Sequence, residues 1–144
     1  MREVKEGRDV QFFVTSGFGE KAFGQLHYSQ AVRIGDRVEI SGQGGWDDDL
    51  NIPASLEEEI VVAFDNVERT LATAGAIWRD VVHVNSYHVI AAPGSTFDAH
   101  NVVMTDQYRK RMGDRAPIWT QIGVTALGLP EMRIEIRVTA IVEN

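Results

Sequence analysis

A short turn separates two segments in which apolar and polar residues alternate. Ala31–Ile34 and Arg37–Ser41 flank the pair Gly35-Asp36, which is typical of tight hairpin turns. In the second segment every other residue is apolar, so one face of the strand is suited to a core. The pattern predicts a β-hairpin with one apolar face.

Two segments have the three- and four-residue spacing of amphipathic helices. The first follows Ser55, which stands three residues before Glu58 as in a capping box, and Gly75 is placed to end it. The second begins near Ser95 and runs to about Met112. Each apolar stripe favours a helix packed on a sheet. The stripe positions are Leu56, Ile60, Phe64, Val67 and Leu71 in the first helix, and Phe97, Met104 and Tyr108 in the second.

Three further segments are rich in β-branched residues and predict strands: Asp80–Ile90, Ile118–Thr125 and Met132–Val142. Residues 1–25 carry the weakest pattern, and we expect an irregular arm there with one short strand near Phe12–Thr15. The predicted order of elements is therefore β-β-β-α-β-α-β-β.

This order predicts an α+β fold with one mixed sheet of about six strands and two helices packed on one face. The other sheet face would carry both apolar and polar side chains, and we expect another subunit to cover it. No linker or repeat interrupts the pattern, so we interpret residues 1–144 as a single domain.

Composition narrows the function classes. The formal net charge is −7 and basic residues cluster only at Arg109–Arg111, which disfavours a nucleic-acid partner. The chain has no cysteine, so disulfides and thiolate chemistry are excluded. No apolar run is long enough for a membrane span, and the charged start Met1–Glu6 lacks a signal-peptide pattern, so we expect a cytoplasmic protein. Glu57–Glu59 fall in the first turn of a helix, where they favour its dipole.

Few residues suggest chemistry by themselves. His83 and His88 stand five apart in a predicted strand and point to opposite faces, which disfavours a shared metal site. We interpret His83 and His100 as polar residues of the surface or rim. Glu135 interrupts an apolar strand. It is either an exposed carboxylate paired with Arg137 or a buried functional acid with a raised pKa.

Four segments together resemble the motifs of one family. They are H-Y-S-Q-A-V at residues 27–32, R-V-E-I-S-G-Q at 37–43, L-A-T-A-G-A with the following W-R-D-V-V within 71–82, and L-P-E-M-R-I-E-I at 129–136. In this order and spacing they resemble the YjgF/RidA family over about residues 24–142.

The resemblance implies a chorismate-mutase-like fold of the bacillus type. It also implies a homotrimer whose sheets form an inner barrel, with ligand clefts between the subunits. The deaminase branch of the family hydrolyses an enamine or imine to a ketone and ammonia, without a metal or a cofactor.

The residues carried over by the resemblance form a candidate site. Glu135 and Tyr28 match the catalytic positions, and the S-G-Q segment contributes Ser41, Gly42 and Gln43 as substrate-binding residues. His27 stands where the family usually has a proline before the tyrosine, and we include it at the binding site.

One family residue is replaced. The family's P-x-R-S falls on Pro117–Thr120, so Trp119 occupies the position of the arginine that binds the substrate carboxylate. Gln121 stands two residues further on, and the nearest other cations in the sequence are Arg115 and Arg137. An indole offers one N–H and an aromatic face in place of a charged fork. We therefore expect Trp119 and Gln121 to contact a planar or aromatic small molecule.

Three functions remain open from the sequence. The first is hydrolysis or rearrangement of an enamine, an imine or a related reactive metabolite in a cleft between subunits. The second is a non-catalytic trimer that binds a small ligand or a partner. The third is ribonuclease activity or inhibition of translation, which the acidic composition disfavours.

Overall fold

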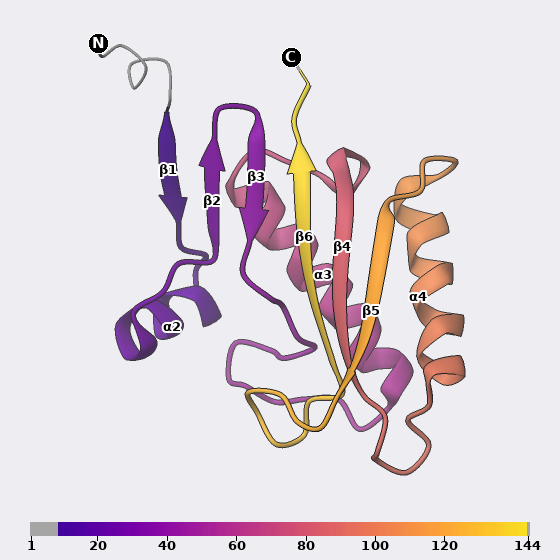
Figure 1. Ribbon diagram of the computed structural model, residues 1–144. Coiled ribbons are helices and arrows are strands. Elements are labelled where there is room, and N and C mark those ends of the chain that lie inside the picture. Colours follow the sequence, from indigo (N-terminus) through magenta and orange to yellow (C-terminus); the bar gives the residue numbers. More distant parts are fainter. Residues whose placement is uncertain (1–8, 144) are drawn as a thin grey trace.

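The computed structural model describes residues 9–143, so the predicted charged start at Met1–Glu6 lies outside the described residues. Six strands form one mixed sheet in the order β1-β2-β3-β6-β4-β5 (Figure 1). Only β4 and β5 are parallel neighbours; the other neighbouring pairs are antiparallel. The strands are β1 (Val10–Phe13), β2 (Ala31–Ile34), β3 (Arg37–Ile40), β4 (Val81–Val89), β5 (Ile118–Val124) and β6 (Ile134–Ile141). The predicted α+β class and six-stranded sheet are confirmed.

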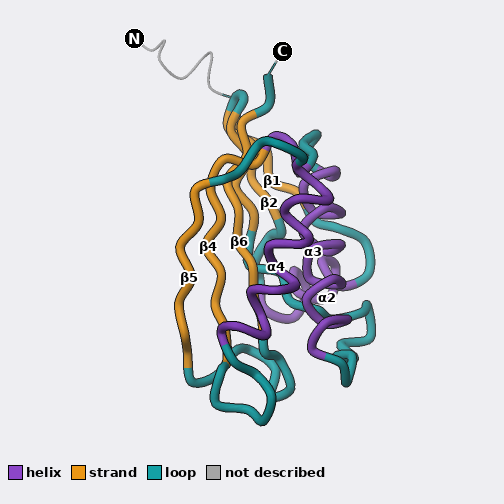
Figure 2. The backbone as a smooth tube through the Cα atoms, turned by 90° about the vertical axis from the view of Figure 1, so that its right-hand side faces the viewer, coloured by secondary structure: helices purple, strands orange, loops and turns teal. Residues whose placement is uncertain are grey.

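All helices lie on one side of the sheet (Figure 2). Both predicted helices are present, as α3 (Leu56–Thr73) and α4 (Phe97–Met112), and a single 3-10 turn, η1 (Trp78–Asp80), precedes β4. Within residues 9–143, no helix has the length and apolar character that crossing a bilayer requires.

A third helix, α2 (Phe18–Leu26), corrects the expectation of an irregular arm and of only two helices. Its glycines disfavour helix in isolation, which explains why the local pattern did not predict it. Glu20 accepts a hydrogen bond from the backbone N–H of Gly17, 3.3 Å away, at the start of the helix. Phe18 and Ala22 are buried, and Phe18 stacks on Trp46 at 4.2 Å between ring centroids. Tertiary packing therefore holds this segment as a helix.

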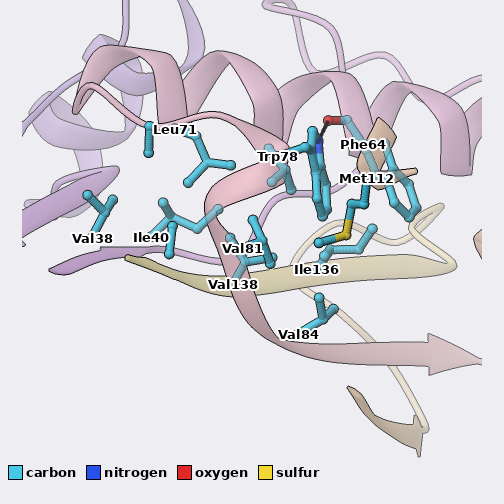
Figure 3. Packing of buried hydrophobic residues seen from close by; sticks show 14 of the residues in the cluster. Val38, Ile40, Phe64, Leu71, Trp78, Val81, Val84, Met112, Ile136 and Val138 are labelled. Carbon is cyan, nitrogen blue, oxygen red and sulfur yellow. Dashed lines mark hydrogen bonds between the residues drawn. The ribbon is translucent and has the colours of Figure 1, made fainter. Parts of the chain in front are cut away.

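The main core lies between α3 and the central strands (Figure 3). Alternate residues of β6 point toward the helices, and these residues are fully buried. The indole N–H of Trp78 donates to the carbonyl of Phe64 at 3.2 Å, which joins η1 to α3. The shared apolar face consists of Val38, Ile40, Ile60, Phe64, Leu71, Ile134, Ile136 and Val138.

The two predicted helix starts differ in outcome. Ser55 caps α3 as expected, with its hydroxyl accepting from the Glu58 N–H at 3.2 Å. The cap of α4 is Thr96, which accepts from the Ala99 N–H at 3.0 Å, and not Ser95. The Ser95 hydroxyl instead donates to the Val89 carbonyl at 2.5 Å, so it is not free to cap the helix.

A buried ion pair joins the start of α3 to the start of β6. Glu59 has no exposed surface, and its carboxylate accepts from the backbone N–H and the Nε of Arg133, both at 2.7 Å. Arg133 also donates to the carbonyls of Pro53 and Ala54. Glu59 lies in the first turn of α3, as predicted, but the favourable dipole is only part of its role. It fixes Arg133, which directly precedes β6 and stands two residues before Glu135.

We predict that Glu59→Gln lowers the free energy of unfolding by about 3 kcal/mol, because the Arg133 guanidinium loses its charged partner in a buried setting. Urea denaturation at neutral pH measures this effect. The matched control is Glu58→Gln on the exposed side of the same turn, which should change stability by no more than about 0.5 kcal/mol. Equal effects of the two substitutions would show that the buried pair contributes nothing special.

Candidate active site

A cleft of about 340 Å³ opens at the end of the sheet where β3 ends and β6 begins. One wall is α2, which contributes Phe18, Ala22 and Leu26 at four-residue intervals. This spacing is the signal in the sequence from which the wall was predictable. The remaining lining includes Lys21, Gln25, Tyr28, Ser41, Gly42, Trp46, Leu50, Gly128, Leu129, Met132 and Glu135.

The cleft brings together four of the predicted site residues: Tyr28, Ser41, Gly42 and Glu135. Glu135 points away from the core, because its neighbours Ile134 and Ile136 face the helices. Its carboxyl lies directly over Gly42, where a Cβ would stand 2.7 Å from the Glu135 Cδ and clash still more closely with an oxygen. Only a residue without a side chain allows this approach.

Glu135 has the environment of a functional acid more than that of a surface ion pair. Arg137, its possible partner in the sequence, instead donates to Glu39 Oε1 at 2.6 Å. Among the described residues, Glu135 has no hydrogen-bond or ion-pair partner. Partial burial raises the pKa of its carboxyl above the usual value.

Gly42 also offers the free backbone donor of the cleft. The neighbouring N–H groups are used, since Ser41 donates to the Gln30 carbonyl and Gln43 donates to the Ile136 carbonyl, both at 2.8 Å. The Gly42 N–H has no acceptor within residues 9–143. Gly42 lines the cleft and packs against the Glu135 carboxyl, so this unpaired N–H belongs to a residue that a ligand can reach.

The other polar residues around the cleft have distinct positions. Burial raises the pKa of Tyr28, and the nearby charge of Glu135 acts in the same direction, so the phenol is a proton donor at neutral pH. Gln43 is buried behind the cleft, where its amide donates to Gln30 Oε1 at 2.8 Å. His27 ends α2 with φ 57° and lines an adjacent groove with Phe23, outside the main cleft.

Trp119 and Gln121 lie on the other face of the sheet. In the register of β4 and β5, Gln121 is level with Ser86, which in turn is level with the core residue Ile136. Trp119 donates its indole N–H to Ser86 Oγ at 2.9 Å and packs edge-on against Tyr108 at 5.2 Å between ring centroids. Within one subunit, neither side chain lines the cleft that holds Glu135.

Trp119 begins a buried chain of hydrogen bonds that crosses from β5 to α4. Ser86 Oγ lies 2.6 Å from His88 Nε2, and His88 Nδ1 lies 2.8 Å from His100 Nδ1. The chain continues from His100 Nε2 to Ser95 Oγ at 2.8 Å. His88 and His100 are completely buried, so the interpretation of His100 as a rim residue was wrong, whereas His83 is half-exposed on the opposite face.

The partners at the two ends of this series of hydrogen bonds determine which nitrogen carries the proton in each histidine ring. Ser95 donates its hydroxyl proton to the Val89 carbonyl, so it must accept from His100 Nε2–H. His100 Nδ1 is then an acceptor, and His88 Nδ1 carries the proton between the two rings. His88 Nε2 consequently accepts, which matches the amide donor of Gln121 3.2 Å away. Both imidazoles are neutral. Burial is the main cause that lowers the pKa of His88 to about 3 and of His100 to about 4.

The residues present favour proton transfer by side chains. The cleft combines a carboxyl group, a phenol and a free backbone donor at one end with an apolar wall at the other. Within the described part of the chain, no three histidine, aspartate or glutamate side chains are grouped so as to hold a metal ion.

Comparison with known proteins finds one matching family model and relatives that are similar over most of the chain. The family model described as Endoribonuclease L-PSP matches residues 20–142. The RutC family protein YjgH of Escherichia coli (strain K12) is 32% identical over 114 residues, which cover 79% of this chain and 83% of YjgH. A 2-iminobutanoate/2-iminopropanoate deaminase of Dermatophagoides farinae is 30% identical over 118 residues, covering 81% and 86%.

Solved structures agree with these sequence matches. A member of the YjgF family from Mycobacterium tuberculosis superposes with a TM-score of 0.72 at 27% identity, covering 93% of this chain and 100% of that protein. The predicted chorismate-mutase-like fold is thereby confirmed.

We predict that the free energy of unfolding falls as the pH drops below about 6.5, the ordinary pKa of histidine. His88 and His100 bind protons in the unfolded chain at these pH values, whereas in the folded protein they are buried and stay neutral. Between pH 7.5 and 5 the loss should reach up to about 2 kcal/mol per histidine. The raised pKa of Glu135 acts in the opposite direction, so a difference between variants is the cleaner measure.

Urea denaturation as a function of pH, on wild type, His88→Gln and the exposed-site control His27→Gln, isolates this contribution. His88→Gln should lose stability at neutral pH and show a shallower decline toward pH 5, whereas His27→Gln should follow wild type. If the free energy of unfolding of His88→Gln depended on pH as steeply as that of wild type, the histidines in the hydrogen-bonded series would not be held neutral in the folded protein.

Proposed function

Because this chain belongs to the Endoribonuclease L-PSP family, the YjgF/RidA family of its sequence motifs, we propose that it hydrolyses an imine or enamine in the cleft beside Glu135, without a cofactor. The observation that carries the proposal is the Glu135 carboxyl, which has a raised pKa and is held against the backbone of Gly42. The name of the deaminase from Dermatophagoides farinae supports the same reaction class.

The proposed reaction needs one water and returns every proton. Glu135 in its ionised form takes a proton from water as the oxygen attacks the C=N carbon, and passes this proton to the nitrogen to give a neutral carbinolamine. The ionised carboxylate then takes the O–H proton of the carbinolamine and delivers it to the nitrogen as the C–N bond breaks. The products are the ketone and ammonia, and Glu135 returns to its ionised form. An enamine enters the same path after protonation at carbon.

Two other groups in the cleft would assist. The Gly42 N–H is free to donate to the oxygen as it develops into a carbonyl, which is the usual role of a fixed backbone donor. Tyr28 holds its phenolic proton at neutral pH and can donate a second hydrogen bond. Ser41 is held by its hydroxyl, which donates to the Ser29 carbonyl at 2.8 Å, so we assign it to the wall.

We also propose that the protein is a homotrimer in which the uncovered sheet face is buried. Isoleucines project from the edge strand β5 on the face opposite the helices, and Ile118 is 66% exposed. A polar cluster of Glu39, Arg137 and Thr139 lies on the same face. Membership of the family supports this proposal. Trp119 and Gln121 lie on the helix side of the sheet, so they do not contact a ligand in the cleft of their own subunit.

Three expectations from the sequence stay predictions: the single domain over residues 1–144, the cytoplasmic location and the absence of a nucleic-acid partner. Ribonuclease activity gains little support from the cleft. Among the described residues its titratable lining is Glu135, Tyr28 and Lys21, and the Lys21 ammonium already donates to the Asp48 carbonyl and to Asp49, so a phosphate would have to compete with both for this one cation.

We predict that Glu135→Gln lowers imine hydrolysis about 10²–10⁴-fold, because the amide keeps the shape and cannot carry the proton. Ammonia release from imines made in situ measures the rate. The variant should keep the thermal midpoint of wild type and its mass in light scattering, which we expect to be about three times 16.0 kDa.

The matched control is Glu131→Gln, an exposed carboxylate shortly before β6. It should leave the rate at the wild-type value. Equal rates for wild type and Glu135→Gln would remove Glu135 from the reaction. Ligand binding without turnover in either protein would instead support the non-catalytic binding function.

A further inference from the structure

We infer that the cleft selects imines or enamines whose non-reacting part is hydrophobic and uncharged, and that α2 is the element that imposes this selection. The inference rests on the proposed hydrolysis beside Glu135, and it adds the class of substrate. It differs from what the name of the deaminase relative implies, since 2-iminobutanoate and 2-iminopropanoate carry a carboxylate.

The wall opposite the reacting end is apolar over most of its area. Phe18 of α2 stacks on Trp46, and Met132 belongs to the same buried cluster. Leu26 is 72% exposed in the free subunit and lines the open cleft, so its side chain is available to a ligand. Burial of apolar ligand surface against this wall is favourable by about 25 cal/mol per Å².

Within one subunit, the described cations around the cleft already have partners. Lys21 is the sole basic residue among the described lining, and its ammonium donates to the Asp48 carbonyl and lies 3.4 Å from Asp49. Arg137 shares a second groove with Ser41, Gly42 and Glu135, and its guanidinium donates to Glu39 Oε1 at 2.6 Å. A carboxylate in this space would have to displace Asp49 or Glu39 from these cations and would face the Glu135 anion, which is costly.

The polar groups are confined to one end of the cleft. Tyr28, Ser41, Gly42 and Glu135 come from the end of β3, the segment before β2 and β6, whereas α2 and the residues before β6 supply the apolar surface. A ligand that fits both ends has one small polar head, the C=N group, and one aliphatic or aromatic body. An iminium head is also compatible, since its positive charge would pair with ionised Glu135.

The test compares two probes that share one skeleton and differ in a carboxylate: phenylacetone, a neutral ketone, and phenylpyruvate. Binding to the whole protein is followed by NMR through the indole N–H signal of Trp46, which lines the cleft. Neutral probe binding should be at least about tenfold tighter than phenylpyruvate binding. This measurement does not depend on catalysis.

A charge placed on α2 should reverse the preference. Gln25 lines the cleft and Gly24 does not, and a side chain at Gly24 would meet no atom within 4 Å. Gln25→Arg should therefore favour phenylpyruvate by about tenfold or more relative to wild type, because arginine pairs bidentately with a carboxylate. Gly24→Arg adds the same charge to the same helix and should keep the wild-type order.

The binding results test the selectivity of the cleft, and the hydrolysis results test the proposed function, so the two can fail independently. Tighter binding of phenylpyruvate to wild type, or no binding of either probe at millimolar concentration, would overturn the inference. A reversal in both arginine variants would show a general charge effect and would also overturn the role of α2. Preferred binding of phenylacetone with no hydrolysis of its imine would uphold the selectivity and reject the hydrolase.

Discussion

The absence of a side chain at Gly42 is the constraint on which the cleft depends. Antiparallel pairing of β3 with β6 continues beyond the strand through Gln43 and Ile136, which exchange backbone hydrogen bonds of 2.8 and 2.9 Å. This pairing places Gly42 beside Glu135, and the missing Cβ leaves room for the carboxyl group. The same contact desolvates the acid and puts it next to a free backbone N–H. One glycine thereby determines the position, the ionisation and the hydrogen-bonding surroundings of Glu135.

The two faces of the sheet divide the polar residues into separate tasks. On the cleft side, Glu135 is left without a partner among the described residues. On the helix side, Trp119, Ser86, His88 and His100 form a continuous series of hydrogen bonds. The buried Tyr108 hydroxyl beside them has no hydrogen-bond partner among the described residues. Trp119 thus uses its indole N–H to join β5 to β4, and the hydrogen bonds continue from β4 to α4. Within one subunit, Trp119 does not line the cleft that holds Glu135.

Much of the fold was predictable because it depends on local patterns. The β-branched runs of the strands and the stripe of α3 have clear periods, and their ends agree with the structure within a few residues. The position of Glu135 also followed from its place among apolar neighbours. α2 was missed because its glycines disfavour a helix, and only contacts such as that of Phe18 with Trp46 stabilise it. The burial of Glu59 and His100 depends on partners that lie far away in the sequence or on another element. The side to which Trp119 points depends on the register between β4 and β5, and no motif encodes that register.

The ionisation of Glu135 is the property that most directly tests this arrangement. The carbon-13 signal of its carboxyl can be followed by NMR over a range of pH in wild type and two variants. Gly42→Ala is the test variant, because it displaces the carboxyl group, and Gly24→Ala on α2 is the control. The midpoint in wild type and in Gly24→Ala should lie above the ordinary value of 4.5, because burial disfavours the charged form. In Gly42→Ala the midpoint should move back toward 4.5, because a Cβ forces the carboxyl out of its position. A wild-type midpoint at or below 4.5 would contradict the assignment of Glu135 as a partly buried acid with a raised pKa.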